Sequence, residues 1–205
     1  MALMRYPRFR FRPSQADALH IDLWLNGECQ LLDAGSYSYA LMGHPPGDLA
    51  ATRSHNTVEF DRRDQMPRLG RFLYGAWLRS EYVGAIEAAS GAQSFEASYV
   101  DWQGARHFRR ITLSGARLEV RDRISGFRDT AVLRWRLRPG SWQVEGNSVT
   151  DGRHRLTVRA SAPLARFELV PGYTSLHYLS FTEVPVLEVE IRSPGELTSE
   201  YAWTR

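Results

Sequence analysis

The amino-acid sequence predicts an all-β fold, an antiparallel β-sandwich of many short strands. From about residue 17 to the end, apolar and polar residues alternate in short runs, as in strands that bury one face. Turn-forming pairs separate the runs, among them Asn26-Gly27, Ser114-Gly115, Pro139-Gly140 and Asp151-Gly152. Strands at this spacing with one polar face are typical of a two-layer antiparallel sandwich.

The first strand is expected over 19–25, where leucine and isoleucine alternate with His20, Asp22 and Trp24. The pair Asn26-Gly27 tolerates positive φ and suits a hairpin turn, so residues 29–33 are expected to form the returning strand. The same alternation predicts further strands at 118–124, 133–137, 156–158 and 187–191.

Residues 69–84 allow two interpretations. The apolar residues between Leu69 and Leu78 fit a helical stripe, but Gly70, Gly75 and Gly84 argue against a helix. Each glycine there costs about 1 kcal/mol relative to alanine, so strands are favoured. The stretch 41–51, which contains His44-Pro45-Pro46-Gly47, is expected to be a loop.

Length and composition indicate one globular domain over 1–205, with 1–8 as a flexible lead-in. The chain is 43% hydrophobic and 24% charged, which excludes collagen-like, coiled-coil and wholly disordered classes. No apolar run approaches the roughly 18 residues that a membrane span needs. The N-terminal residues have no secretory signal, so the chain as given is expected in the cytoplasm.

The net charge of the chain is close to zero, but its basic residues are of a single type. The 26 basic residues are all arginine, against 23 acidic residues, for a net charge of +3. This balance does not predict nucleic-acid binding. A coding bias accounts for the absence of lysine, although guanidinium groups also bind carboxylates and sulfates through two hydrogen bonds. Cys29 is the one cysteine, so neither an internal disulfide nor a cysteine metal site is expected.

Two polar segments carry the residue types that chemistry needs. Asp33 follows the predicted hairpin, and His55 opens a strand in the segment Arg53-Ser54-His55-Asn56-Thr57-Val58. An aspartate and a histidine that meet can share a metal ion or a hydrogen bond. The hydrogen-bonded pair is the favoured interpretation, because two residues this far apart in sequence are a weak metal signature.

The chain resembles the C-terminal β-sandwich domain of heparinase II/III-like polysaccharide lyases. The resemblance rests on Ala-Asp-Ala-Leu with its Asn-Gly turn, Asp-x-Gly-x-Tyr-x-Tyr at 33–39 and Ser-His-Asn-Thr-Val at 54–58. The turn at Asp64-Gln65-Met66 and the strand at 186–189 extend it over most of the chain.

The resemblance implies a helical α/α toroid that packs against this sandwich, with an acidic polysaccharide in the cleft between them. Relatives cleave uronate-containing chains by β-elimination. Neutralising the uronate carboxylate makes the C5 proton acidic enough for a base to remove. The toroid supplies a tyrosine as the acid, and no toroid is present in this chain.

The resemblance also implies a site from which two histidines are missing. Relatives carry His-x-His-x-Asp where this chain reads Pro13-Ser14-Gln15-Ala16-Asp17. The family's metal ligands therefore map to Gln15, Asp33 and His55. A neutral amide is a poor zinc ligand, so no cofactor is expected to be required and a zinc ion is the less favoured alternative.

The remaining candidates are a base and a set of arginines. His55 and His20 are the candidate catalytic residues, although a surface or interface position is favoured for His20. Arg53, Arg68, Arg71 and Asn56 flank or belong to the family-like motifs and are the candidate substrate-binding residues. The arginines of the later strands are expected on a solvated face; they are Arg121, Arg123, Arg134, Arg136 and Arg138.

The sequence therefore predicts the sandwich domain of a carbon-oxygen lyase that acts on acidic polysaccharide, inactive without a toroid partner. The alternative is a non-catalytic binding or assembly module for acidic polysaccharide such as glycosaminoglycan. The family resemblance implies a periplasmic or cell-envelope location if an export signal lies upstream.

Overall fold

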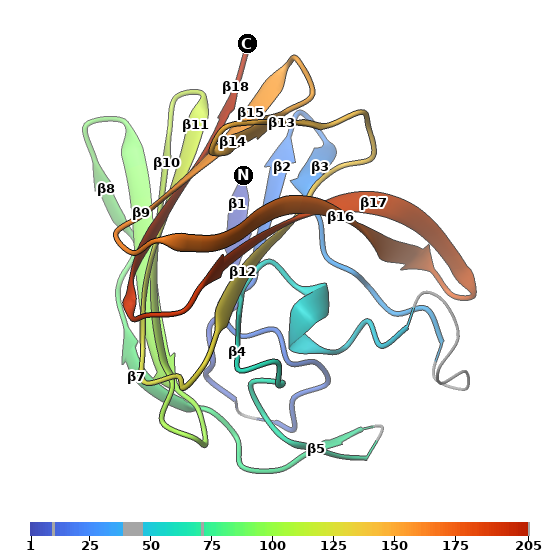
Figure 1. Cartoon of the computed structure of the whole chain (residues 1–205), viewed down its shortest axis with the longest axis vertical. Helices are drawn as coiled ribbons and strands as arrows, with labels where there is room; N and C mark the ends of the chain where they lie inside the picture. Colours follow the sequence, from blue (N-terminus) through green and yellow to red (C-terminus); the bar gives the residue numbers. More distant parts are fainter. Residues whose placement is uncertain (10, 39–46, 71, 205) are drawn as a thin grey trace.

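The computed structural model describes residues 1–9, 11–38, 47–70 and 72–204, and these residues form a nearly all-β protein. Two antiparallel sheets make up the main layers (Figure 1), which confirms the predicted sandwich. No helix of the described residues is long and apolar enough to cross a membrane.

The large sheet has nine strands in the order β13-β14-β15-β18-β11-β10-β9-β7, with β8 paired to β9. All the pairs between neighbouring strands are antiparallel, and β9, β10, β11 and β18 form its centre. The strands are β7 (Arg79–Val83), β8 (Glu87–Ala89), β9 (Ala92–Val100), β10 (Arg106–Ser114), β11 (Arg117–Ser125), β13 (Gln143–Glu145), β14 (Ser148–Thr150), β15 (His154–Ala160) and β18 (Gly195–Trp203).

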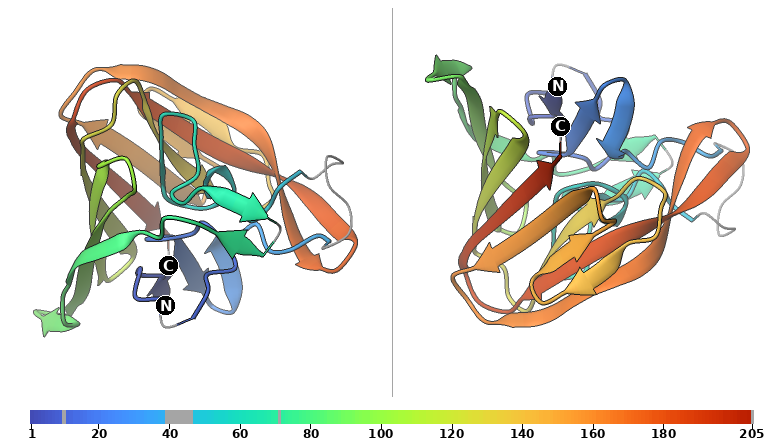
Figure 2. Two further views of the ribbon diagram at one scale, coloured as in Figure 1. Left: turned by 90° about the horizontal axis from the view of Figure 1, so that it is seen from below. Right: turned by 90° about the horizontal axis from the view of Figure 1, so that it is seen from above.

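The second layer is a four-stranded sheet in the order β16-β17-β12-β4. Its strands are β4 (Val58–Phe60), β12 (Ala131–Arg136), β16 (Leu164–His177) and β17 (Ser180–Ile191). The hairpin of β16 and β17 curves across the molecule and its tip extends beyond the body (Figure 2). Leu176, Tyr178 and Leu179 are exposed at that tip.

A three-stranded sheet holds the N-terminal part of the chain next to these layers. It contains β1 (Ala2–Met4), β2 (Ile21–Leu25) and β3 (Glu28–Leu31). Beyond β3 the chain pairs with the end of β12, since Leu32 N–H donates to Arg136 O at 2.9 Å. A short pair, β5 (Arg68–Gly70) and β6 (Leu73–Tyr74), and one 3-10 turn, η1 (Thr52–Ser54), complete the elements.

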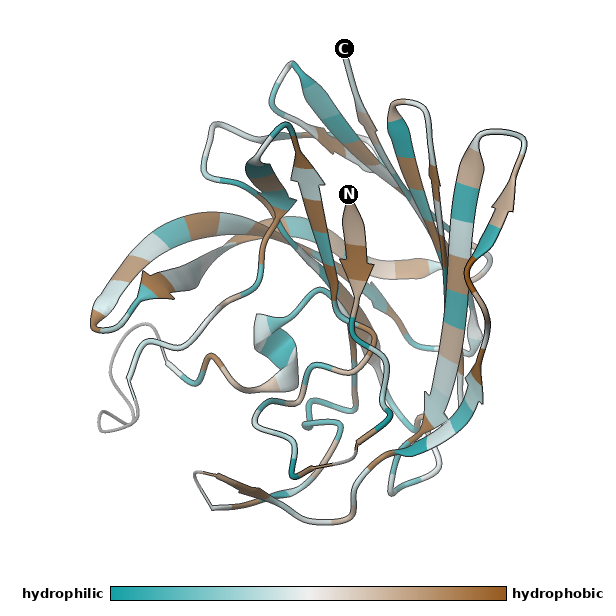
Figure 3. Cartoon of the chain, turned by 180° about the vertical axis from the view of Figure 1, so that it is seen from behind, coloured by the Kyte–Doolittle hydropathy of each residue, from teal (hydrophilic) through white to brown (hydrophobic). Residues whose placement is uncertain are grey.

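The core lies between the layers and explains the alternation in the sequence. Along β11, Leu118, Val120 and Ile124 are buried while Arg121 and Arg123 are exposed. Apolar and polar bands alternate along the long strands of the large sheet (Figure 3). Burial of each larger side chain contributes about 1.5–3 kcal/mol, so this face determines the register.

Two predictions about β12 and the N-terminus are wrong. Arg134 and Arg136 were expected on a solvated face, but they are only 9% and 4% exposed. β12 lies between β17 and β4, and Arg134 bonds there to Glu59 and Glu188. Residues 1–8 were expected to be a flexible lead-in, yet Ala2–Met4 form β1 in register with β2.

Other expectations are confirmed or lie outside the described residues. The described residues between 68 and 83 include the strands β5, β6 and β7 and no helix, as expected. The predicted returning strand ends at Leu31 instead of 33. Most of the predicted loop at 41–51 falls on residues 39–46, which lie outside the description.

Candidate functional site

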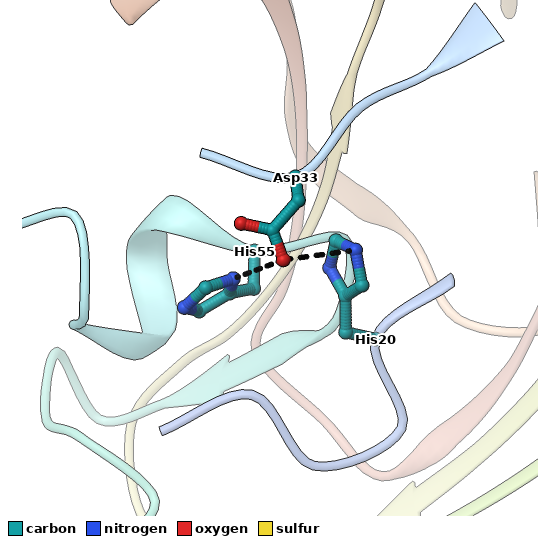
Figure 4. A group of neighbouring side chains, drawn as sticks. All are labelled: His20, Asp33 and His55. Atoms are coloured by element: carbon teal, nitrogen blue, oxygen red, sulfur yellow. Dashed lines mark ion pairs between the residues drawn. The ribbon is translucent and has the colours of Figure 1, made fainter. Parts of the chain in front are cut away.

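Three polar side chains from separate segments meet between the N-terminal sheet and the second layer. His20 precedes β2, Asp33 follows β3, and His55 follows η1. Both imidazoles point toward one carboxylate oxygen of Asp33 (Figure 4), at 3.6 Å from His20 Nε2 and 3.8 Å from His55 Nδ1. The two imidazole rings stand at 86° to each other with centroids 5.4 Å apart. The predicted meeting of Asp33 and His55 therefore holds.

Asp33 is positioned by the turn that follows it. Its Oδ1 accepts a hydrogen bond from Gly35 N–H at 2.5 Å. Gly35 has φ +75, and a Cβ there would lie 2.0 Å from the carbonyl oxygen of Ser175 in β16. The Gly in Asp-x-Gly is therefore required for the close approach to β16. Burial alone would raise the pKa of Asp33, but the charge of Arg5 and the Gly35 N–H outweigh it and lower the pKa, so the carboxylate is ionised.

His20 is held in one protonation state by its two neighbours. Its Nδ1 accepts a hydrogen bond from Asn56 N–H at 2.9 Å, so that nitrogen carries no proton. The proton is therefore on Nε2, which lies 3.0 Å from Asp22 Oδ1 and donates to it. The ring is fully buried, and Leu19 before it adopts φ 61, which turns the side chain inward. The favoured surface position for His20 is wrong.

His55 is the least satisfied member of the cluster. Its ring is fully buried, and neither ring nitrogen has a hydrogen-bond partner. Burial lowers the pKa of His55 to about 3, with the charges of Arg5 and Arg136 acting in the same direction and Asp33 against them. The imidazole is therefore neutral at physiological pH.

Asn56 organises the segments around the histidines. Its Nδ2 donates to Ile21 O at 2.8 Å and to Leu32 O at 3.0 Å, and its Oδ1 accepts from Arg136 N–H at 2.6 Å. The side chain is fully buried, and both the nitrogen and the oxygen of its amide form hydrogen bonds with backbone groups. This arrangement corrects the expectation that Asn56 binds substrate: it is a positioning residue that ties β2, β3 and β12 together.

Arg5 enters this cluster from the N-terminal sheet, and the sequence did not reveal it. Its Nη1 lies 2.6 Å from Asp33 Oδ2, donates to Asp17 Oδ2 at 2.7 Å, and reaches Gln15 Oε1 at 3.4 Å. Gln15 Nε2 in turn donates to Gly35 O at 3.2 Å. The candidate ligand Gln15 is thus beside Asp33, but its amide oxygen faces a guanidinium group.

A hollow with arginines on its wall lies next to the histidine cluster. It has a volume of about 230 Å³ and is lined by Asp48, Leu49, Arg53, Ser54, Arg134, Arg136, Val170, Pro171, Gly172, Tyr173, Val186 and Glu188. Arg136 donates there to Ser54 O and Tyr173 O rather than to a carboxylate. Burial lowers the pKa of Arg136 to about 10, so it remains charged.

The candidate substrate-binding arginines differ in exposure and in their contacts with other side chains. Arg53 is exposed on η1 beside this hollow. Arg68 forms an ion pair with Asp48 and its guanidinium carbon lies 5.8 Å from the centre of the Tyr74 ring. Arg71 lies outside the described residues. Of the two described arginines, Arg53 is therefore the better placed to contact an acidic ligand.

The family model described as heparinase II/III-like, C-terminal, matches residues 6–195. The chain belongs to this family. Among solved structures, the heparinase III of the BT4657 gene product superposes with a TM-score of 0.81 at 15% identity, covering 99% of this chain and 32% of that chain. The heparan sulfate lyase HepC from Pedobacter heparinus superposes with a TM-score of 0.69 at 16% identity, and the match covers 93% of this chain and 31% of that chain. No curated protein sequence matches the chain.

These structural matches establish the fold and its extent. A further structure, described as heparinase III, gives a TM-score of 0.69 at 14% identity, with 91% of this chain and 29% of that chain covered. This heparinase II/III-like sandwich therefore spans about a third of the length of the enzymes that it resembles.

The zinc ion that the resemblance implies does not fit the residues of this heparinase II/III-like site. Two features favour a metal: the nitrogens of His55 and Asp33 Oδ2 have no hydrogen-bond partner, and His20, Asp33 and His55 lie close together. His20 has no free nitrogen lone pair, and Gln15 offers only an amide oxygen. Arg5 Nη1 already contacts the Asp33 oxygen that would bind the metal.

Neither candidate catalytic histidine is set up as a base. His20 Nδ1 is bonded to a backbone N–H and its Nε2 bears the proton. His55 is buried, and an imidazole with a pKa of about 3 is a weak base at neutral pH. The geometry therefore supports a positioning role for both rings in this family member.

Proposed function

We propose that this chain is the sandwich part of a lyase that cleaves uronate-containing polysaccharide by β-elimination, working together with a helical toroid domain. The family match supports the lyase relationship, and the hollow beside His55 supports an acidic ligand. A periplasmic or cell-envelope place of action is part of the same proposal, since acidic polysaccharides are found there.

The single observation that carries the proposal is the pairing of a family-type Asp33–His55 site with a hollow beside η1 whose wall carries Arg53 and Arg136. Arg53 is exposed there, so its guanidinium group can bind a uronate or a sulfate. Arg136 is buried and donates to Ser54 O and Tyr173 O, and it has no carboxylate partner among the described residues, so its positive charge adds to the attraction. Neutralisation of the uronate carboxylate is the first requirement of β-elimination.

The other requirement, an accessible base and acid, is not met by the described histidines of the site. His20 and His55 are both buried, and the first has no free lone pair. We therefore propose that the toroid supplies the proton-transfer groups and that the sandwich alone has little or no lyase activity.

Lyase activity tests the catalytic half of the proposal. The purified chain is incubated with heparan sulfate and other uronate polymers, alone and mixed with the toroid domain of a heparinase II/III relative, and the ultraviolet absorbance of the unsaturated product is followed. We expect no increase with the chain alone and an increase in the mixture. Full activity of the chain alone would contradict the need for a toroid, and no activity in any mixture would contradict the lyase role.

Polysaccharide affinity tests the binding half. Replacing Arg53 with alanine removes a charged contact worth roughly 1.5–3 kcal/mol, so affinity for an acidic polymer is expected to fall about tenfold or more. Affinity electrophoresis in gels containing heparan sulfate, at two salt concentrations, measures this change. Arg159→Ala is the matched control, because Arg159 is an exposed arginine on β15 in the large sheet and does not line the hollow. An equal loss in both variants would show non-specific charge attraction only.

The second candidate function is a non-catalytic binding or assembly module. The buried histidines favour it, because the site keeps its architecture without an accessible base. Retardation by acidic polymer that depends on Arg53, combined with no product in any mixture, would select this function over the lyase.

A further inference from the structure

Arg5 lies at the edge of the site, with its side chain 37% exposed and its guanidinium group directed at a set of acceptors. Its guanidinium Nη1 is 2.6 Å from Asp33 Oδ2, 2.7 Å from Asp17 Oδ2 and 3.4 Å from Gln15 Oε1. Its Nη2 is 3.9 Å from Asp22 Oδ2. One arginine therefore contacts three carboxylates that come from different segments of the chain.

The backbone fixes Arg5 at this place. Arg5 N–H donates to His20 O at 2.9 Å, and Leu19 N–H donates to Arg5 O at 2.6 Å. These bonds continue the pairing of β1 with β2, in which Met4 lies opposite Ile21. The pairing of β1 with β2 therefore places Arg5 next to Asp33, and it also positions His20.

The charge around Arg5 shows why a cation is required. Asp17, Asp22 and Asp33 are each less than 20% exposed, at 19%, 13% and 19% of the side chain. The hydrogen bonds of His20 make that ring neutral, so it cannot compensate them. Buried carboxylates without a nearby positive charge are strongly unfavourable.

We propose that the Arg5 guanidinium is the resident cation of this site and takes the place that a divalent metal ion holds when the Gln15 position is a histidine. Gln15 and Arg5 then form a matched pair. The neutral amide oxygen of Gln15 can accept a hydrogen bond from the Arg5 guanidinium, whereas a histidine at that position would offer a ring nitrogen to a metal ion. The site is built to work without a metal. This inference does not depend on lyase activity.

Metal binding by a set of variants tests the proposal. Gln15→His restores an imidazole beside Asp33 and His55, and Arg5→Ala removes the competing charge. We measure zinc per chain by elemental analysis after equilibrium dialysis, and the shift of the melting temperature on adding zinc or a chelator. The double variant is expected to hold one zinc and to gain stability from it, while the wild type and Gln15→His hold none in stoichiometric amount.

The comparison with a matched control separates Arg5 from general surface charge. Arg8→Ala with Gln15→His removes an exposed arginine nearby and is expected to remain without zinc. Removing a like charge about 4 Å away is worth a few kcal/mol, so zinc affinity should be at least about tenfold higher in the Arg5→Ala double variant than in Gln15→His.

Several results would overturn the proposal. Stoichiometric zinc in the wild type, or equal zinc binding by Gln15→His with and without Arg5, would show that the guanidinium does not exclude the metal. Failure of the properly folded Arg5→Ala double variant to bind zinc would show that the ligand geometry, not the arginine, excludes it. Circular dichroism checks folding. If the Arg5→Ala double variant does not fold, Arg5→Gln with Gln15→His takes its place, because it removes the charge and keeps a polar side chain, and the same zinc outcomes decide.

Discussion

Two clusters in this molecule contain an arginine, an aspartate and a histidine, and they differ in how completely their polar atoms are paired. In the large sheet, Arg109, Asp122 and His107 have fully buried side chains. Arg109 donates to both oxygens of Asp122, at 2.6 Å from Nε and 3.0 Å from Nη2, and His107 Nε2 lies 2.6 Å from Oδ1. In the candidate site, Arg5 is 37% exposed and Asp33 Oδ2 has no hydrogen bond of good geometry.

The difference indicates which cluster supports the fold and which is a functional site. The Arg109 cluster also reaches the site, because Arg109 Nη1 donates at 2.6 Å to the carbonyl of Leu19 and at 2.6 Å to that of Asn56. These residues directly adjoin His20 and His55. A more completely paired cluster in the core, in which only His107 Nδ1 lacks a partner, thus holds the segments on which the less completely paired site is built.

The largest expected effect comes from breaking the core cluster. Asp122→Asn leaves Arg109 buried without its counter-charge, and such a loss typically costs about 3–5 kcal/mol. Urea unfolding measures the free energy of unfolding. Glu200→Gln is the control, because its ion pair with Arg117 is exposed and should contribute less than about 1 kcal/mol. Similar costs for both substitutions would contradict a structural role for the buried cluster.

A smaller effect is expected from the turn that positions Asp33. Gly35→Ala places a methyl group against Ser175 O and strains a residue at φ +75, so we expect a loss of about 1–3 kcal/mol. Gly27→Ala is the matched control: φ is +85 and no atom lies within 4 Å of a Cβ there, so it reports the backbone strain alone. If both variants unfold at the same urea concentration, the close approach of this turn to β16 is not what requires glycine.

The smallest effect is a dependence of stability on pH. Burial lowers the pKa of His107 below its ordinary 6.5, although Asp122 opposes the shift. A group with a lowered pKa in the folded state stabilises the fold above its unfolded pKa and loses that contribution as the pH falls. Stability is therefore expected to decrease below about pH 6.5, by up to about 1.4 kcal/mol per pH unit for this one group.

The variant His107→Gln checks the source of that slope. Glutamine keeps an N–H donor near Asp122 but does not titrate, so its unfolding free energy should change less between pH 6.5 and 5 than that of the wild type. Identical pH profiles for the two proteins would assign the slope to other groups.

The sequence predicts the strands well and the site only in part, for physical reasons. Alternation reports which face of a strand is buried, so the sandwich and the β5–β7 segment could be predicted. The same rule failed for His20, because Leu19 adopts a left-handed conformation that turns the next side chain inward. It failed for Arg134 because Glu59 and Glu188 from the neighbouring strands pair with it inside the second layer.

Arg5 could not be predicted because its role depends on tertiary pairing. Nothing in the first eight residues indicates a strand, and only the register of β1 on β2 brings Arg5 to Asp33. The sequence did contain one signal, which is the glutamine at position 15 where the resemblance implies a histidine. Because buried carboxylates need a nearby positive charge, the absence of this metal ligand indicates that another cation is present. The fold places Arg5 beside Asp33 in that role.

A crystal structure grown with zinc in the medium, with anomalous data at the zinc edge, tests the identity of the cation at this site most directly. We predict no anomalous peak between Asp33 and His55, with the Arg5 guanidinium ion-paired with Asp33. A peak at that position with Asp33 and His55 as ligands, and Arg5 turned away, would contradict the account.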